Sequence, residues 1–197
     1  ILEDDYDSEY RYGGRPLSAL QGLDNAGRVI YVGTFSKVLF PGIRLGYMVV
    51  PPGLSKDFVA VRRSLDDQTP IAMQPVLTEF IQSGHFAAHI RRMRTLYAER
   101  QGVLLDALNN KVSDLMSALP DDAGMHIVAD LNPKLNLRDT EISQLAAKRK
   151  ITVYPLSGFF IGPQTRNGLV FGYAGVEARD IVSGVDILSK VIREVLT

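Results

Sequence analysis

The stretch GTFSKVLFPGIRLGY, residues 33–47, lies between two short apolar runs and carries two cations, Lys37 and Arg44. The run that leads into it, residues 28–34, is rich in β-branched and aromatic side chains. The run that follows, residues 45–50, ends at a Pro-Pro-Gly turn. Both runs are typical of buried strands. We therefore predict a strand, a loop that holds both cations, and a second strand.

A third apolar run opens the chain and ends in acidic residues. Ile1 to Asp5 has the pattern of a buried strand, and the glycines and proline of residues 11–16 indicate a turn after it. Ligands of open α/β sheets bind at the carboxyl ends of the strands. We therefore expect polar groups from two strand ends to lie close together. These groups are Asp4, Asp5, Tyr6, Thr34, Ser36, Lys37 and Arg44.

The remainder of the chain alternates between helical and strand patterns. Apolar residues recur at helical spacing from about residue 70 to 108, with an interruption near Gly84. Beyond that, we predict strands at 125–130, 151–154 and 169–173, and helices at 138–149 and 177–196. The sequence thus predicts three parts: 1–69 as the tail of a larger domain, 70–108 as connecting helices, and 109–197 as a small α/β domain.

Composition excludes several classes of protein. Lys plus Arg and Asp plus Glu number 22 each, so no net charge draws the chain to nucleic acid or an acidic membrane. There is no cysteine for a disulfide or thiolate site. No apolar run approaches the roughly 20 residues that span a bilayer. We expect a cytoplasmic protein and, because the chain opens at Ile1 inside an apparent strand, a fragment of a longer one.

The polar set matches the needs of pyridoxal phosphate. That cofactor requires an amine for its aldehyde, a carboxylate for its ring nitrogen, a phenol near its ring oxygen, and hydroxyl or cationic donors for its phosphate. Arginine offers a fork of donors that suits phosphate. By chemistry alone a second interpretation stands equally: Lys37 and Arg44 are surface charges, and the two aspartates cap a turn or helix.

Several motifs, in order, resemble one family. Residues 36–47, SKVLFPGIRLGY, resemble the signature of class I/II aminotransferases, which have the fold type I pyridoxal-phosphate architecture. Residues 3–12, 14–23 and 29–37 are similar to the aminotransferase-like domain of MocR-type regulators, which are GntR-family transcription factors. Further similar segments at 89–97, 123–127 and 153–157 extend the resemblance over nearly the whole chain. It implies the carboxyl-terminal half of such a domain, including the end of a large-domain mixed sheet.

The resemblance also assigns roles. It implies that Lys37 is the catalytic lysine that bonds to pyridoxal phosphate, that Asp4 pairs with the ring nitrogen, with Asp5 as the weaker candidate, and that Tyr6 meets the ring oxygen. Phosphate contacts are implied for Thr34, Ser36 and Arg44. The family further implies a homodimer with its active site near the subunit interface. No metal site is expected, because His85 and His89 lack a third ligand.

One position departs from the catalytic pattern. Aminotransferases of this family hold the substrate carboxylate with an arginine where this chain has Val170; the nearest arginine is Arg166, which either reaches the substrate or is simply solvated. Efficient transamination needs that anchor. We therefore expect the sensing domain of a regulator, with weak or vestigial transaminase activity. The alternatives are an aminotransferase that acts on amino acids, and a fragment that binds no cofactor alone.

If the protein is a regulator, we expect two kinds of partner, a small-molecule effector and DNA. The effector would be an amine, an amino acid or a form of vitamin B6. DNA would be bound only through a winged-helix domain upstream of residue 1, and no membrane would be involved.

Overall fold

The computed structural model describes residues 1–15, 17–66 and 71–196. The chain divides into two compact units, residues 1–93 and 94–197. Both combine helices with a β-sheet, so the predicted mixed α/β architecture is confirmed. The three-part division at residues 69 and 108 is a different partition, which these two units do not test. No helix among the described residues is long and apolar enough to cross a membrane.

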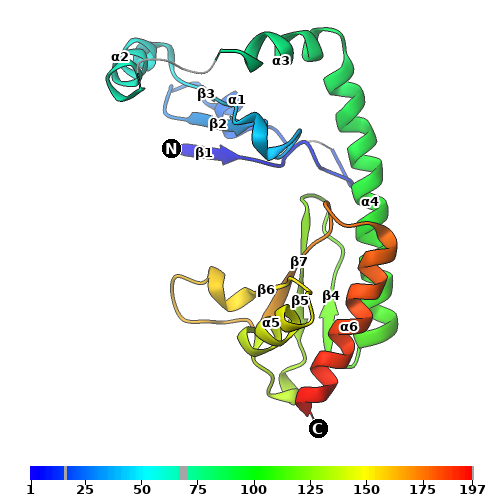
Figure 1. Ribbon diagram of the computed structural model, residues 1–197. Helices are drawn as coiled ribbons and strands as arrows, with labels where there is room; N and C mark the ends of the chain where they lie inside the picture. Colours follow the sequence, from blue (N-terminus) through cyan, green and yellow to red (C-terminus); the bar gives the residue numbers. More distant parts are fainter. Residues whose placement is uncertain (16, 67–70, 197) are drawn as a thin grey trace. The chain divides into compact units, whose positions relative to one another are not determined.

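The first unit contains a three-stranded sheet in the order β1-β2-β3 (Figure 1). Its strands are β1 (Leu2–Asp5), β2 (Ile30–Thr34) and β3 (Gly46–Val49). β1 runs parallel to β2, and β3 runs antiparallel to it. All three predicted strands are therefore present, and the carboxyl ends of β1 and β2 lie at the same edge of the sheet. The prediction that they are buried is wrong for β3, whose four residues are all exposed, and for alternate residues of β1.

The register of this sheet separates the two neighbouring aspartates. Asp4 is opposite Val32, and Asp5 is opposite Gly33. Because side chains alternate between the faces of a strand, Asp4 shares its face with Val32 and Thr34. Asp5 lies on the other face, together with Tyr31. The two carboxylates thus belong to different environments although they are adjacent in sequence.

Helices make up the rest of the first unit. The carboxylate of Glu3 accepts hydrogen bonds from Leu20 N and Gln21 N at 2.8 and 2.9 Å and so caps the first turn of α1 (Leu20–Leu23). The predicted interruption near Gly84 is confirmed, since that residue has φ of 79° between two helices. The other helical elements are η1 (Pro41–Ile43), η2 (Pro52–Leu54), α2 (Ser55–Asp66) and α3 (Met73–Gln82). α4 (His85–Val112) begins in this unit, and its residues from 94 onward belong to the second.

The second unit is built on a four-stranded antiparallel sheet in the order β4-β5-β7-β6. Its strands are β4 (Met116–Ala118), β5 (His126–Leu131), β6 (Tyr154–Pro155) and β7 (Gly168–Gly172). α5 (Asp139–Lys148) and α6 (Ala178–Leu196) complete the unit with η3 (Pro133–Leu135) and η4 (Leu156–Phe159). The strand predicted at 151–154 is wrong in its extent, because only Tyr154 and Pro155 pair with β7.

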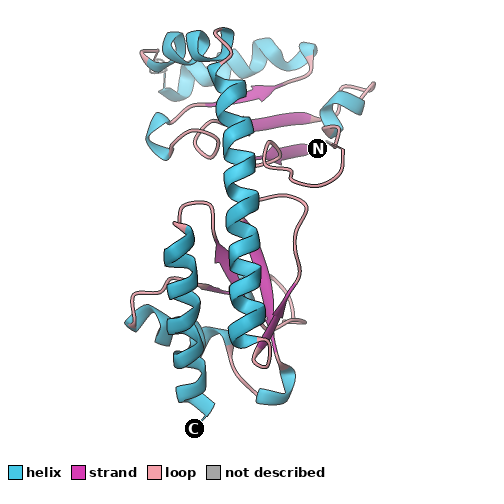
Figure 2. Ribbon diagram, turned by 90° about the vertical axis from the view of Figure 1, so that its right-hand side faces the viewer, coloured by secondary structure: helices cyan, strands magenta, loops and turns pink. Residues whose placement is uncertain are grey.

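One face of this sheet forms the core. Ile127, Ala129 and Leu131 alternate with polar or half-buried neighbours along β5, and their side chains are at most 4% exposed. α6 lies alongside the part of α4 that belongs to this unit (Figure 2) and contributes a stripe of buried side chains at helical spacing. That stripe is Ile181, Val185, Leu188, Val191 and Ile192. Each such side chain contributes about 1.5–3 kcal/mol by burial.

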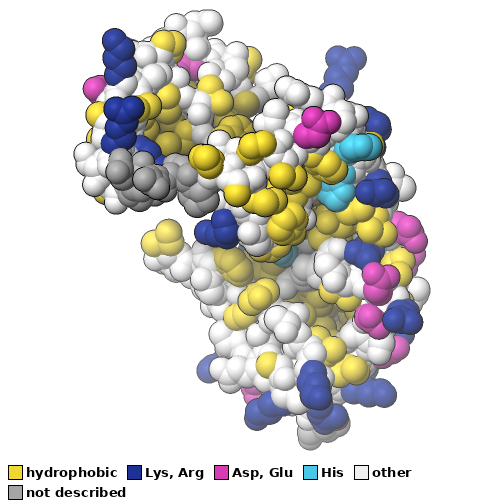
Figure 3. All heavy atoms as spheres, turned by 45° about the horizontal axis from the view of Figure 1, so that its top comes forward, with side chains coloured by type: hydrophobic (Ala, Val, Ile, Leu, Met, Phe, Trp, Pro, Cys, Tyr) yellow, Lys and Arg dark blue, Asp and Glu magenta, His cyan; other side chains and the backbone are white. Residues whose placement is uncertain are grey.

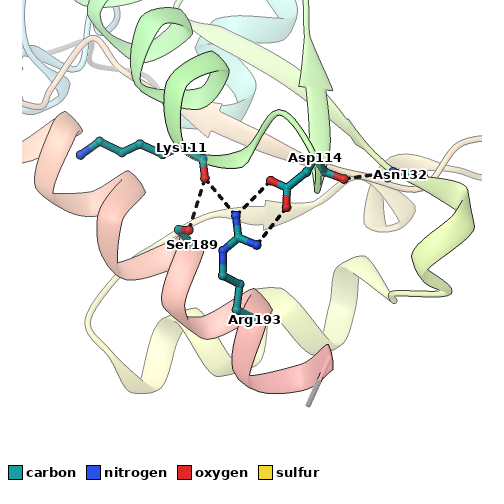
Figure 4. A network of polar contacts seen from close by, with 5 residues as sticks. All are labelled: Lys111, Asp114, Asn132, Ser189 and Arg193. Carbon is teal, nitrogen blue, oxygen red and sulfur yellow. Dashed lines mark hydrogen bonds and ion pairs between the residues drawn. The ribbon is translucent and has the colours of Figure 1, made fainter.

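A polar network joins the end of α6 to the turn between α4 and β4 (Figure 4). The Arg193 guanidinium donates to both carboxylate oxygens of Asp114 at 2.9 and 3.0 Å and to Lys111 O at 3.4 Å. Asn132 Nδ2 donates to Asp114 O at 3.0 Å. The hydrogen bond from Arg193 lowers the pKa of the Asp114 carboxyl. Since both charged groups are exposed, the network fixes the geometry of the turn more than it adds stability.

Candidate functional site

The backbone beside Lys37 is fixed by a buried neighbour. Val38 is 1% exposed, and its carbonyl accepts hydrogen bonds from Tyr10 Oη at 3.3 Å and from His89 Nε2 at 2.9 Å. Tyr10 is itself fully buried. The Lys37 side chain, in contrast, is exposed, and its amine contacts no other described residue through a hydrogen bond or ion pair. The chain therefore holds the loop rigidly and leaves this amine available.

Thr34 and Ser36 shape the turn that leads from β2 to Lys37. Thr34 Oγ1 accepts a hydrogen bond from Ser36 N at 3.2 Å and lies 3.5 Å from Leu45 O. Phe35 N donates to Leu45 O at 3.0 Å, which closes the base of the loop. Both hydroxyl residues are half-buried. The loop is thus held at its start by its own side chains as well as by the sheet.

Asp5 is committed to contacts within the chain. Its carboxylate accepts hydrogen bonds from Ser8 N at 3.1 Å, Ser8 Oγ at 2.6 Å and Tyr31 Oη at 2.7 Å. Burial acts to raise the pKa of the Asp5 carboxyl, but the hydrogen bonds from Ser8 and Tyr31 outweigh it and lower that pKa below its usual value. Burial and the bond to Asp5 raise the pKa of the Tyr31 phenol.

Asp4 is the available carboxylate. It is exposed, lies on the face that carries Thr34, and has no hydrogen bond or ion pair to another described residue. Tyr6 follows it and is 45% exposed. The negative charge of Asp7, burial and the charge of Asp4 raise the pKa of the Tyr6 phenol. Tyr6 therefore keeps its proton at neutral pH and can donate a hydrogen bond.

Arg44 ends η1 in a backbone conformation that costs energy. Its φ is 50°, in the left-handed region that a residue other than glycine seldom adopts. Strain of this kind concentrates at functional sites. The Arg44 side chain is exposed and lines a cavity of about 670 Å³ in the first unit, together with Gly33 and Tyr47. Neither Asp4 nor Lys37 lines that cavity.

Arg166 belongs to the second unit and is engaged there. Its guanidinium donates to both carboxylate oxygens of Asp130, from Nε at 3.0 Å and from Nη2 at 2.8 Å. A substrate carboxylate would have to compete with Asp130 for this bidentate contact. The role of Arg166 in substrate binding therefore stays a prediction, and its ion pair agrees better with the alternative of a surface charge.

Val170 lies among apolar neighbours. In the sheet of the second unit it is opposite Val128 on one side and Tyr154 on the other. The three side chains share the face opposite the core, where Tyr154 is 54% exposed. No cation of the described residues takes the place of an anchor beside Val170 in either neighbouring strand.

Two residues that fix the site were not predicted from the sequence. Tyr10 and His89 reach Val38 from 28 and 51 residues away. Both residues lie in segments that resemble the family, 3–12 and 89–97, but no local pattern pairs either of them with Val38.

Comparison with known proteins places the chain in a family. The family described as aminotransferase class I and II matches residues 7–179, so the chain belongs to that family. Over 95% of its length it is 42% identical to the probable rhizopine catabolism regulatory protein MocR of Rhizobium meliloti, of which it covers 38%. It is also 31% identical, over 88% of its length, to the pyridoxine biosynthesis transcriptional regulator PdxR of Corynebacterium glutamicum, of which it covers 37%. The predicted likeness to MocR-type regulators is confirmed.

A solved structure confirms the fold. The kynurenine aminotransferase of Pyrococcus horikoshii, whose crystal structure includes PMP, superposes with a TM-score of 0.87 at 31% identity. All of this chain is matched, against 48% of that one. The fold is therefore that of a fold type I pyridoxal-phosphate aminotransferase. The chain spans only about two-fifths of the length of the curated regulators that it matches.

Proposed function

We propose that this chain is part of the effector-sensing, aminotransferase-like domain of a regulator that binds pyridoxal phosphate, with Lys37 as the attachment point. The β1–β2 register carries the proposal. It sets Asp4 on the same face as Thr34, just before the loop that bears Lys37, while Asp5 is occupied on the opposite face. The amine, the carboxylate, the phenol and the hydroxyl that such a cofactor requires are thus all present.

The cofactor, when bound, supplies an aldehyde that bonds to an amine and a ring that withdraws electrons from it. Lys37 would provide the amine, and the hydrogen bonds from Tyr10 and His89 to Val38 O would orient it by fixing the adjacent backbone. Asp4 would hold a proton on the ring nitrogen, and Tyr6 would donate to the ring oxygen. Thr34, Ser36 and Arg44 would bind the phosphate. Asp5 would act only through Tyr31 and Ser8, as a positioning residue.

The second unit supports binding of an effector rather than transamination of a substrate. Transamination of an amino acid needs a cation for its carboxylate in both the ground and the transition state. Val170 has apolar neighbours across both adjacent strands, and the guanidinium of Arg166 is paired with Asp130. The proposal therefore includes weak or absent transaminase activity. We further propose that the regulator is a cytoplasmic homodimer and that it binds DNA through an upstream domain. Its effector would be an amine, an amino acid or a form of vitamin B6.

Absorbance spectroscopy tests the attachment. Purified protein titrated with pyridoxal phosphate should develop a visible absorbance band, which Lys37→Ala should abolish. Borohydride reduction followed by peptide mass spectrometry should then locate the added mass on Lys37. Attachment at another lysine, or an unchanged spectrum in Lys37→Ala, would overturn the assignment.

A matched pair of variants tests the choice between the aspartates. Asp4→Asn should shift the band and weaken cofactor binding, because the ring nitrogen loses its carboxylate. Asp5→Asn should leave the position of the band unchanged. The reverse outcome would show that the register argument assigns the wrong carboxylate.

A further inference from the structure

The second unit contains a cavity that the cofactor site does not use. Its volume is about 340 Å³, and it lies between α6, β7 and the connection from α5 to β6. That volume is at the small end of the range of ligand sites, roughly 300–1,000 Å³. All of its lining residues belong to residues 94–197, whereas Lys37 and the groups around it belong to the first unit.

The walls of the cavity are apolar and its rim is charged. Ile151, Val153, Phe171 and Leu188 are among the apolar lining side chains. Lys150 and Asp180 stand in the lining as exposed charged residues. The carboxylate of Asp180 lies 3.7 Å from Arg179 Nε. The Lys150 ammonium has no hydrogen bond or ion pair to another described residue.

Lys150 occupies a position at which the backbone favours glycine. Lys150 N donates to Ala147 O and Ile151 N donates to Ala146 O, both at 3.0 Å, while Lys150 has φ of 63°. This is the Schellman ending of a helix, whose left-handed residue is most often glycine. Attraction to the helix dipole does not require a lysine there, because Lys148 and Arg149 already supply positive charge. The lysine is thus kept in a strained conformation at the rim of the cavity.

At Gly184 the reverse holds, since a glycine occupies a position that favours another residue. It lies in the middle of α6, where glycine is a poor helix former and alanine the best. A Cβ atom built on Gly184 would lie 3.8 Å from Ile151 Cδ1, which is ordinary van der Waals contact. Alanine would therefore fit the helix, but its methyl group would enter the cavity. Lys150 and Gly184, which each cost local backbone stability, thus line the same cavity.

We propose that this cavity is a second ligand site, which binds a small molecule with an apolar body and a carboxylate. The body would lie against the apolar walls that include Ile151, Phe171 and Leu188. The carboxylate would meet the Lys150 ammonium at the rim. This site is independent of the cofactor and of the function proposed for Lys37.

The test uses 3-phenylpropionate as the probe, titrated into the full chain without pyridoxal phosphate and followed by NMR. Lys150→Gly should weaken binding of the carboxylate by up to about fivefold, because the lysine is exposed. Gly184→Ala should weaken both 3-phenylpropionate and the uncharged 3-phenylpropan-1-ol. Both variants should raise the melting temperature, because each relieves a local backbone cost. Lost binding could then not be ascribed to unfolding.

Matched controls separate the cavity from general effects. Asn136→Gly relieves another left-handed residue, with φ of 49°, and Gly102→Ala fills a helical position with no atom within 4 Å. Gly102→Ala should raise stability, and Asn136→Gly should change it little, because asparagine tolerates the left-handed conformation. Both should leave probe binding unchanged, and Lys37→Ala should leave it unchanged too. The proposal is overturned if the wild-type chain does not bind the carboxylate, or if Lys150→Gly and Gly184→Ala bind it as well as the controls do.

Discussion

Replacing Asp139 with alanine should destabilise the second unit severely. Asp139 is 2% exposed and begins α5. Its carboxylate accepts hydrogen bonds from Ser157 N at 2.8 Å, Ser157 Oγ at 2.9 Å and Thr140 N at 2.7 Å. A hydrogen bond to a charged group contributes about 1.5–3 kcal/mol. The two bonds to Ser157, taken at the lower value, give a loss of about 3 kcal/mol in the free energy of unfolding.

Urea denaturation followed by circular dichroism measures this loss, and hydrogen exchange at β5 and β7 assigns it to the second unit. Asp139→Asn, which keeps one acceptor oxygen, should lose about half as much. Asp180→Ala is the matched control, because this aspartate also lies in the first turn of a helix but is exposed; it should change stability by less than about 0.5 kcal/mol. If Asp139→Ala were no more destabilising than Asp180→Ala, the reasoning from buried hydrogen bonds would be refuted.

Three further predictions concern packing, pH and the loop. Gly168→Ala should cost more than about 2 kcal/mol or prevent folding of the second unit, since its Cβ would lie 2.5 Å from Ala129 O, a backbone atom that cannot move aside; thermal melts measure this. The pKa of Asp5 is lowered in the folded chain, so its contribution to stability is present above the unfolded-state pKa, about 3.9, and is lost as pH falls through the lower folded value. Melts across pH 2–6, roughly the span of carboxyl titration, should therefore show a shallower acid decline in Asp5→Asn. Val38→Ala should cost about 2 kcal/mol and slow the reaction of Lys37 with pyridoxal phosphate in stopped-flow absorbance.

Local pattern was enough for the strands around the Lys37 loop. Residues 28–34 and 45–50 are apolar runs with a clear stop at Pro51 and Pro52, and the structure has strands in both. α2 was not predicted, although Phe58, Val61 and Leu65 recur at helical spacing in it; most of its apolar residues are exposed. β4 has only three residues, too few for an alternation to show.

Other features depend on contacts that no local pattern records. Residues 151–153 have the β-branched composition of a strand, yet Ile151 completes the Schellman ending of α5 and Val153 is buried. Only Tyr154 and Pro155 therefore pair with β7. The distinction between Asp4 and Asp5 likewise came from pairing with a strand more than twenty residues away. The family motif indicated the loop that bears Lys37, but only the tertiary contacts show that Asp4, and not Asp5, has a carboxylate without a hydrogen bond to another described residue.

Figure 3 illustrates how much apolar surface the first unit presents. Hydrophobic side chains gather beside the histidines at the start of α4. In that region Leu39, Phe40, Met73 and Phe80 line a groove of about 840 Å³. A hydrophobic surface of this kind is typical of a face that meets another part of an assembly.

The β1–β2 register places successive residues of the first strand on opposite faces of the sheet, which the composition of the strand does not show. The consecutive acidic residues 3–5 look interchangeable, and a substitution among them would seem conservative. A shift of one residue in the pairing of β1 with β2 would retain both aspartates, yet each carboxylate would exchange faces. The register of this strand is therefore more constrained than its residue types. Odd and even positions, rather than the residue types alone, determine which acid is presented to a ligand.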